Sequence, residues 1–308
     1  MHEISTDKWY NLAEDTEVKI RYNETTEIAV FNELKKGHVK VVKVDKDNNE
    51  IFIEGVKFNV MTEDGEILET ITTDENGEAT SDRIPIRYKN VYLQEIETNK
   101  NYVLNDEIIK IELQEDRIIS KTVENESKKG KIQVIKKDFD NKELGVEGVV
   151  FDIICEQTGK VVDTITTDKN GIATSKDLSI LYTYTLVEVS TDKKYNLNTE
   201  PITNLETEYK NTLQIEITNE KKKGQIKIIK KDIDNRNIPL AGVVFDILDE
   251  NGNIVDTVVT DARGEALTKM LPSIDTKYTI REKITKQEYV LSDELHIVTL
   301  QENKIKPV

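Results

Sequence analysis

Three residue types that can react with one another recur in this chain at nearly constant spacing. A lysine and a glutamate are 52 residues apart in three places (Lys43 to Glu95, Lys136 to Glu188, Lys230 to Glu282). An asparagine follows the lysine after 82 or 83 residues in two of them (Lys43 to Asn125, Lys136 to Asn219). A neutral lysine amine can attack an asparagine side-chain carbonyl, while a carboxylic acid carries a proton to the departing ammonia. The product would be an isopeptide bond, formed once.

The residues around this trio predict that its members are buried together. Residues two apart in a β-strand share a face, and Lys43 follows Val39 and Val41 in such an alternation. Glu95 follows Val91 and Leu93 in the same way, and the other copies repeat both patterns. Burying a lysine and a carboxylate apart from each other would cost roughly several kcal/mol each. We therefore expect the lysine, the glutamate and the asparagine to meet in the core.

Burial also predicts the state in which they meet. It disfavours charged forms, so a neutral amine beside a protonated acid is favoured. We expect the acid to bind the asparagine carbonyl oxygen and polarise its carbon, then to pass a proton to the leaving nitrogen. Groups fixed at contact gain effective molarities on the order of 10⁵ M or more. The alternative is a buried ion pair with a hydrogen-bonded asparagine and no covalent bond.

The elements that position these residues belong to a sequence repeat. The segment from Gly37 to Asp45 recurs at residues 130–138 and 224–232, at offsets of 93 and 94 residues. Each copy consists of short segments rich in Val, Ile, Thr and Tyr, separated by Asn-Gly, Asp-Gly and Thr-Gly turns. This pattern is typical of hairpins rather than helices. It predicts an all-β protein of tandem Ig-like or prealbumin-like β-sandwich repeats arranged as a rod.

The repeats predict four segments and two incomplete sites. Residues 1–34 match the last third of a preceding repeat, 35–127 and 128–221 are repeats, and 222–308 is a repeat whose last strand is incomplete. By the offset of Leu300 from Leu113, the third asparagine would fall near position 312, after Val308. The last repeat therefore has a lysine and a glutamate only, and the first fragment a glutamate and an asparagine only (Lys230, Glu282, Glu3, Asn32). Two chains could complement each other through these incomplete sites.

Composition excludes several classes of function. The chain has 43 basic and 59 acidic residues and a formal charge of −16, which repels nucleic-acid phosphate and anionic lipid. No apolar run is long enough to span a membrane, and the N-terminus is too polar for a signal peptide. Asp45-Lys-Asp-Asn48 resembles the start of a calcium loop but lacks its later glycine and glutamate, so a solvated turn is favoured. We expect no metal and no cofactor.

Four motifs together resemble a known family. They are the Lys-x-Asp opening, the Gly-Val-x-Phe strand, the Thr-Asp-x-x-Gly turn and the Tyr-x-Leu-x-Glu strand, where the first repeat has Val91 in place of the tyrosine. They resemble the collagen-adhesin B-type domains, also called SpaA-like or prealbumin-like, of Gram-positive surface proteins. The resemblance implies self-formed isopeptide bonds Lys43–Asn125 and Lys136–Asn219, with Glu95 and Glu188 as the catalytic residues.

The resemblance also implies a function. We expect a structural stalk section of a cell-wall-attached adhesin or fimbrial protein, located outside the cell on the bacterial surface. Its partners would be neighbouring repeats of a longer surface protein, and a host matrix protein bound through a domain outside this chain. The alternative is that the repeats themselves bind a host matrix ligand. An enzyme acting on an external substrate is not expected, because the reactive trio consumes itself.

Overall fold

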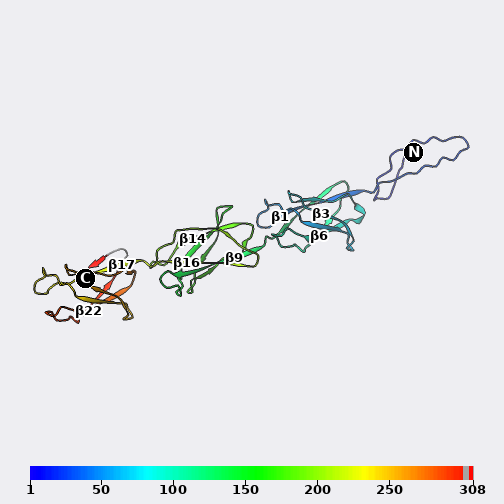
Figure 1. The fold of residues 1–308 in the computed structure, drawn as a ribbon. Helices are drawn as coiled ribbons and strands as arrows, with labels where there is room; N and C mark the ends of the chain where they lie inside the picture. Colours follow the sequence, from blue (N-terminus) through cyan, green and yellow to red (C-terminus); the bar gives the residue numbers. More distant parts are fainter. Residues whose placement is uncertain (301–304, 308) are drawn as a thin grey trace. The chain divides into compact units, whose positions relative to one another are not determined.

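The computed structural model of the chain describes residues 1–300 and 305–307. Residues 301–304 and Val308, on which the expected end of the last repeat falls, lie outside the described residues. The fold is all-β, as predicted, and consists of three copies of one two-sheet arrangement (Figure 1). Among the described residues there is no α-helix, and one 3-10 turn, η1, spans Ile86–Tyr88.

The first copy contains eight strands. In chain order they are β1 (Lys36–Asp45), β2 (Lys57–Met61), β3 (Ile67–Thr72), β4 (Glu78–Thr80), β5 (Ile84–Pro85), β6 (Asn90–Glu97), β7 (Ile108–Glu112) and β8 (Ile118–Asn125). One sheet has the order β3-β2-β6-β7. In the other, β1 pairs with β4, β5 and β8. The first and last strands of the copy are therefore direct neighbours.

The other two copies repeat this arrangement. The second contains β9 (Lys129–Asp138), β10 (Val150–Cys155), β11 (Lys160–Thr166), β12 (Ile172–Thr174), β13 (Leu178–Ser179), β14 (Thr183–Ser190), β15 (Ile202–Glu206) and β16 (Thr212–Asn219). The third contains β17 (Lys223–Ile229), β18 (Val244–Leu248), β19 (Ile254–Val259), β20 (Glu265–Leu267), β21 (Leu271–Pro272), β22 (Lys277–Ile284), β23 (Leu295–Thr299) and β24 (Ile305–Pro307).

The pairing of first and last strands is parallel and fixes the register of the site. Along β1 and β8, Lys43 lies opposite Val123 and Asp45 opposite Asn125. In the second copy, Asp138 of β9 lies opposite Asn219 of β16. Because alternate residues share a face, each lysine and the asparagine two positions further along the partner strand point to the same side. The register thus brings both side chains to one end of the core.

Each copy buries its own apolar core between its two sheets. Along β1 buried and half-buried residues alternate, and Val39 and Val41 are fully buried beside Lys43. Phe58 of β2 and Leu93 of β6 face them from the other sheet as members of the same core cluster. The alternation read from the sequence therefore describes a sandwich buried on its inner faces.

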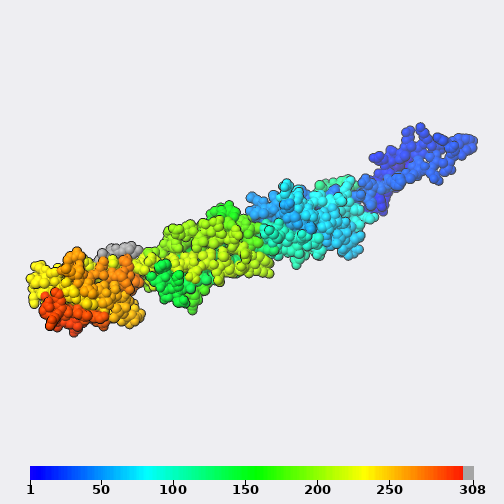
Figure 2. Space-filling view, in the orientation of Figure 1, coloured from blue at the N-terminus to red at the C-terminus, as the bar shows by residue number. Residues whose placement is uncertain are grey.

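Residues 1–34 form no such sandwich. Their backbone makes one isolated bridge, between Tyr10 and Leu34, and no extended strand. Figures 1 and 2 show this segment, at the blue end of the colour scale, as an extended loop without a packed second layer. Ile28, Val30 and Phe31 are accordingly exposed.

Candidate functional site

In the first repeat, the lysine, glutamate and asparagine singled out from the sequence are buried in mutual contact. Lys43 on β1, Glu95 on β6 and Asn125 at the end of β8 are 0%, 3% and 1% exposed. Lys43 Nζ donates to Asn125 Oδ1 at 2.6 Å, and Asn125 Nδ2 donates to Glu95 Oε1 at 2.6 Å. Lys43 Nζ also lies 2.9 Å from Glu95 Oε2, an ion-pair distance without hydrogen-bond alignment.

The second repeat contains the same arrangement. Lys136, Glu188 and Asn219 are 0%, 5% and 2% exposed. Lys136 Nζ donates to Asn219 Oδ1 and to Glu188 Oε2, both at 2.7 Å, and Asn219 Nδ2 donates to Glu188 Oε1. Two independent copies thus place an amine at the carbonyl end of an amide and a carboxyl group at its nitrogen end.

The orientation of the amide differs from the expectation. We expected the glutamate to bind the asparagine carbonyl oxygen, but in both repeats it binds the amide nitrogen. The physical reason is complementarity, since the lysine N–H groups donate to the amide oxygen and the glutamate oxygens accept from the amide nitrogen. The amide therefore turns its oxygen to the lysine and its nitrogen to the glutamate. In this orientation the carboxyl group is already beside the nitrogen that would leave.

Burial acts directly on the two lysines. Desolvation lowers the pKa of Lys43 below its usual 10.5, and the nearby Glu95 carboxyl group only partly opposes this. The pKa of Lys136 is lowered by the same cause, opposed by Glu188. A lowered pKa increases the fraction of neutral amine at a given pH, and only the neutral amine is a nucleophile.

A tight turn from another strand positions the lysine backbone. Lys43 N donates to Gly77 O at 2.7 Å, and Gly77 has a φ of +68° at the end of the Thr-Asp-x-x-Gly motif. A Cβ at Gly77 would overlap the carbonyl oxygen of Lys43. The same overlap would arise between Gly171 and Lys136. The motif therefore requires glycine both for its left-handed conformation and for its contact with the reactive lysine.

Two further groups hold the asparagine and the glutamate, and they were not recognised in the sequence. Asn125 Nδ2 also donates to Thr98 Oγ1 at 2.7 Å, and Asn219 Nδ2 to Thr191 Oγ1 at 3.1 Å. The backbone N–H of Asn105 donates to Glu95 Oε1 at 3.3 Å. A threonine follows the glutamate by three residues in the three repeats and in the N-terminal segment (Thr98, Thr191, Thr285, Thr6). That constant spacing was the sequence signal that could have identified the threonine as part of the site.

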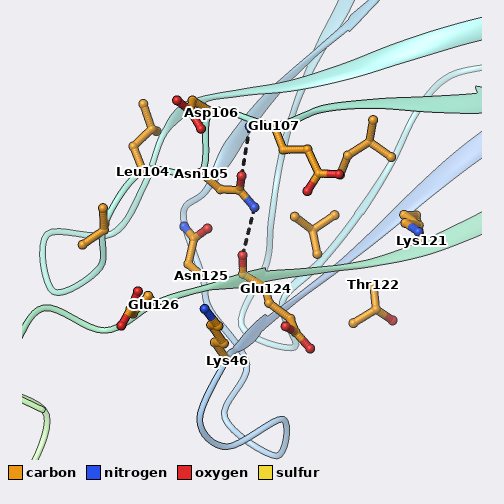
Figure 3. Close-up of a pocket in the computed structure, with 13 residues that line it drawn as sticks. Lys46, Leu104, Asn105, Asp106, Glu107, Lys121, Thr122, Glu124, Asn125 and Glu126 are labelled. Carbon is orange, nitrogen blue, oxygen red and sulfur yellow. Dashed lines mark hydrogen bonds between the residues drawn. The ribbon is translucent and has the colours of Figure 1, made fainter.

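The side chain of Asn105 also fastens the closing strand next to the site. Its Nδ2 donates to the carbonyl oxygen of Glu124 at 3.1 Å, and its Oδ1 accepts from Glu107 N at 3.0 Å. Figure 3 shows Asn105 bridging the two segments beside Asn125, at the edge of a cavity of about 430 Å³. The asparagine strand is thus held by side chains as well as by the sheet.

An Asp–Tyr contact two positions beyond the lysine, in the second and third repeats, was likewise missed. Tyr195 Oη donates to Asp138 Oδ2 at 2.8 Å, and Lys221 Nζ lies 2.7 Å from the same oxygen. Burial alone would raise the pKa of Asp138, but Lys221 and Tyr195 together hold that pKa below its usual 3.8. Tyr289 makes the same contact with Asp232. Since Asp138 lies opposite Asn219, this contact fixes the end of the strand that carries the asparagine.

We expect Tyr195→Phe to lower the free energy of unfolding of the second repeat by roughly 1–3 kcal/mol, because a hydrogen bond to a buried carboxylate is lost. The pKa of Asp138 is depressed, so its stabilisation is present above about pH 3.8 and is lost as the pH falls through the lower folded value. The difference in unfolding free energy between Tyr195→Phe and the unaltered chain should therefore decrease in acid. Urea unfolding followed by hydrogen exchange of residues 130–221 measures it, with exposed Tyr22→Phe as control. An equal midpoint for both variants would contradict the role of this contact.

The two incomplete sites are arranged differently. In the N-terminal segment, Asn32 Nδ2 donates to Glu3 Oε2 at 2.6 Å and to the Asn11 carbonyl oxygen at 2.9 Å. In the third repeat, Lys230 Nζ donates to Glu282 Oε2 at 2.9 Å. The side chain of Lys230 is 28% exposed, whereas those of Lys43 and Lys136 are fully buried. Each incomplete site therefore keeps the hydrogen bond between its two residues, but it is less buried than the complete sites.

The first aspartate of each calcium-like sequence accepts hydrogen bonds from backbone N–H groups of its own turn. Asp45 Oδ1 accepts from the N–H groups of Asp47 and Asn48 at 2.8 and 2.9 Å, and Asp138 and Asp232 make the same pair of bonds. Within residues 1–300 and 305–307, no group of three or more His, Cys, Asp or Glu side chains is placed to hold a metal ion. In the same part of the chain, no helix has the length and apolar character needed to cross a membrane.

Comparison with solved structures finds relatives among bacterial proteins. The Bacillus anthracis TIE protein matches 90% of this chain with 27% identity and a TM-score of 0.64. This chain spans about half of that protein, 51% of its length. The major pilin subunit BcpA of Bacillus cereus matches 89% of this chain and 99% of its own, with 16% identity and a TM-score of 0.35. The shaft pilin SpaA of Lactobacillus rhamnosus GG matches 61% of this chain and 97% of its own, with 15% identity and a TM-score of 0.27.

No match was found among curated proteins. A family model, described as the SpaA prealbumin-like fold domain, matches residues 37–127, 130–221 and 224–308. These three matches cover most of the chain and correspond to the three copies of the two-sheet fold. The chain therefore belongs to the SpaA family of prealbumin-like domains and contains three consecutive copies of that domain.

Proposed function

We propose that this chain is a structural stalk section of a Gram-positive cell-surface protein, an adhesin or fimbrial protein, and that its first two repeats are closed by isopeptide bonds. The bonds are Lys43–Asn125 and Lys136–Asn219, formed with the help of Glu95 and Glu188. The observation that carries this proposal is the burial of each trio in hydrogen-bond contact between the first and last strands of its repeat.

The geometry favours the reaction in three respects. The lysine is desolvated, the amide is held at both ends, and the glutamate is placed beside the leaving nitrogen. Attack of Lys43 Nζ on Asn125 Cγ forms the new amide, while Glu95 transfers a proton from the amine to the departing Nδ2. Ammonia leaves, so each site reacts once. The chain is therefore no enzyme for an external substrate.

The position of the bond suits a load-bearing part. The chain enters each repeat through its first strand and leaves it through its last, and these strands are parallel neighbours. A covalent bond between them carries tension directly from one to the other, so the strands in between remain unloaded. This supports a stalk that holds other parts of a surface protein away from the cell wall, with neighbouring repeats as its partners.

The intact mass of the denatured chain tests the chemistry. We expect it to be lower than the mass of the plain sequence by two molecules of ammonia, because two repeats contain a complete trio and the third contains only Lys230 and Glu282. Peptide mapping should recover one fragment that joins the Lys43 and Asn125 peptides and another that joins the Lys136 and Asn219 peptides. A mass equal to that of the sequence would rule out both bonds.

A further inference from the structure

In each complete site, two side chains hold the nitrogen that would leave as ammonia. Asn125 Nδ2 donates one hydrogen bond to Glu95 Oε1 at 2.6 Å and another to Thr98 Oγ1 at 2.7 Å. The second repeat repeats both contacts (Asn219 Nδ2 to Glu188 Oε1 at 2.5 Å and to Thr191 Oγ1 at 3.1 Å). An amide nitrogen carries two hydrogens, so both are used. The carboxyl group is therefore only one of the two partners of the leaving nitrogen.

A β-bulge brings the threonine to the side of the glutamate. By simple alternation, residues three apart in a strand point to opposite faces. Two consecutive residues of β2 pair with Glu95 and Glu97 of β6, so Ile96 is an extra residue without a partner. Such a bulge shifts the alternation by one residue, and Thr98 therefore points to the same side as Glu95. The second repeat contains the same bulge (Glu188 and Ser190 paired with β10, Val189 extra).

The turn that follows the threonine is fixed to the end of the asparagine strand. Asn101 N donates to Asn99 Oδ1 at 3.1 Å, as in an Asx-turn. Lys128, three residues after Asn125, donates its backbone N–H to Asn101 O at 2.8 Å. The second repeat has both contacts (Lys194 N to Asp192 Oδ1, Lys222 N to Lys194 O, both 2.8 Å). Thr98 is therefore held between the strand of the glutamate and that of the asparagine.

The contact with the threonine becomes stronger as the bond forms. Attack of the lysine amine makes the asparagine Cγ tetrahedral, and Glu95 then transfers a proton to Nδ2. The nitrogen carries a positive charge until the Cγ–Nδ2 bond breaks. A hydrogen bond from a charged nitrogen is about twice as strong as one from a neutral amide. Thr98 Oγ1 therefore binds the transition state more tightly than the starting amide, which is the condition for accelerating the reaction.

We propose that Thr98 and Thr191 are further catalytic residues of the crosslinking reaction, and that their hydroxyl oxygens bind the leaving nitrogen while it gains its proton. This role rests on the proposed isopeptide chemistry and adds no reactant to it. The bond from the lysine Nζ to the asparagine Cγ forms, and the Cγ–Nδ2 bond breaks. One amine proton passes through the glutamate to Nδ2, which leaves as ammonia. The threonine neither gains nor loses a proton.

The rate of bond formation in a Thr98→Val chain tests this role, because valine keeps the shape of the side chain and lacks the hydroxyl. The full chain is made by cell-free synthesis, and samples are quenched in acid at intervals after synthesis is stopped. We expect the Lys43–Asn125 link to form about tenfold more slowly than in the unaltered chain. The Lys136–Asn219 link of the same molecules should form at its usual rate. Peptide mapping measures both linked fractions in every sample.

Three further measurements separate the hydroxyl from ordinary packing. Thr98→Ser keeps the hydroxyl and should restore the rate of the unaltered chain. Thr72→Val, at an exposed position of β3, is the matched control and should change neither rate. The pH dependence of the rate should keep its shape in Thr98→Val, because a threonine hydroxyl does not titrate where lysine and glutamate do. Hydrogen exchange of residues 37–127 shows that the first repeat of each variant is folded.

The outcomes distinguish a failure of this role from a failure of the proposed function. Equal rates for Thr98→Val and the unaltered chain would overturn the role of the threonine and leave the isopeptide bonds standing. A Thr98→Ser chain as slow as Thr98→Val would overturn it as well, since packing would then explain the effect. An unaltered chain that loses no ammonia would overturn the crosslinking function itself. Thr191→Val and Thr191→Ser repeat the comparison in the second repeat and decide it if Thr98→Val does not fold.

Discussion

A chain carrying Glu188→Gln is expected to keep the crosslink in its first repeat and to lose the one in its second. Glutamine retains the size of the side chain and an acceptor for Asn219, but it has no exchangeable acid proton to transfer to the leaving nitrogen. Loss of a positioned general acid–base slows such a step by about 10²–10⁴-fold. The denatured chain should then be heavier by one ammonia than expected for the substitution alone.

The effect should be confined to the altered repeat. Glu95→Gln should remove only the Lys43–Asn125 linkage, and the double variant should show no loss of ammonia. Glu147→Gln, an exposed glutamate of the second repeat, serves as the matched control and should leave both bonds in place. If Glu188→Gln still showed a linked pair of Lys136 and Asn219 peptides, the glutamate would have no catalytic part in the reaction.

Asn219→Ala is expected to lower the free energy of unfolding of the second repeat by roughly 4–5 kcal/mol. The bond closes a segment of 83 residues, and a crosslink of that span restricts the unfolded chain by about this amount in the chain-entropy model developed for disulfides. Alanine leaves Lys136 paired with Glu188, as Lys230 is with Glu282, so no buried charge is left alone. Denaturant unfolding followed by hydrogen exchange of residues 130–221 measures the change.

Two comparisons separate the crosslink from ordinary packing. Asn170→Ala alters an exposed asparagine of the same repeat and should leave its stability within about 0.5 kcal/mol of the unaltered value. The third repeat should not respond to either substitution. A loss of less than about 1 kcal/mol for Asn219→Ala would mean that the asparagine does not close a covalent loop in the folded chain.

The sequence predicted the fold and the three central residues of the site, but not the contacts that hold them. The alternation of Val39, Val41 and Lys43 placed the lysine on an inward face, because side chains in a strand repeat every two residues. The repeat of about 93 residues then related each of the three lysines to one glutamate and the first two also to one asparagine. In the structure these residues are buried and in contact in two repeats.

Local alternation does not reveal contacts that depend on where a loop returns to the sheet. The hydrogen bond from Asn125 to Thr98 and that from Tyr195 to Asp138 both join a strand to the segment that follows the glutamate. The orientation of the amide was missed for another reason, since it depends on which partner takes the oxygen once all three groups are assembled. The constant intervals from glutamate to threonine and tyrosine were the only sequence signal for the first two.

The parallel pairing of first and last strands has a topological consequence once it is bonded. Between Lys43 and Asn125, and between Lys136 and Asn219, the backbone and the new bond form two closed rings in series. A single cut by a protease in any loop of a ring opens the ring but does not divide the molecule. A single cut would divide the molecule only outside the rings, for example between Asn125 and Lys136, where the chain is a single path.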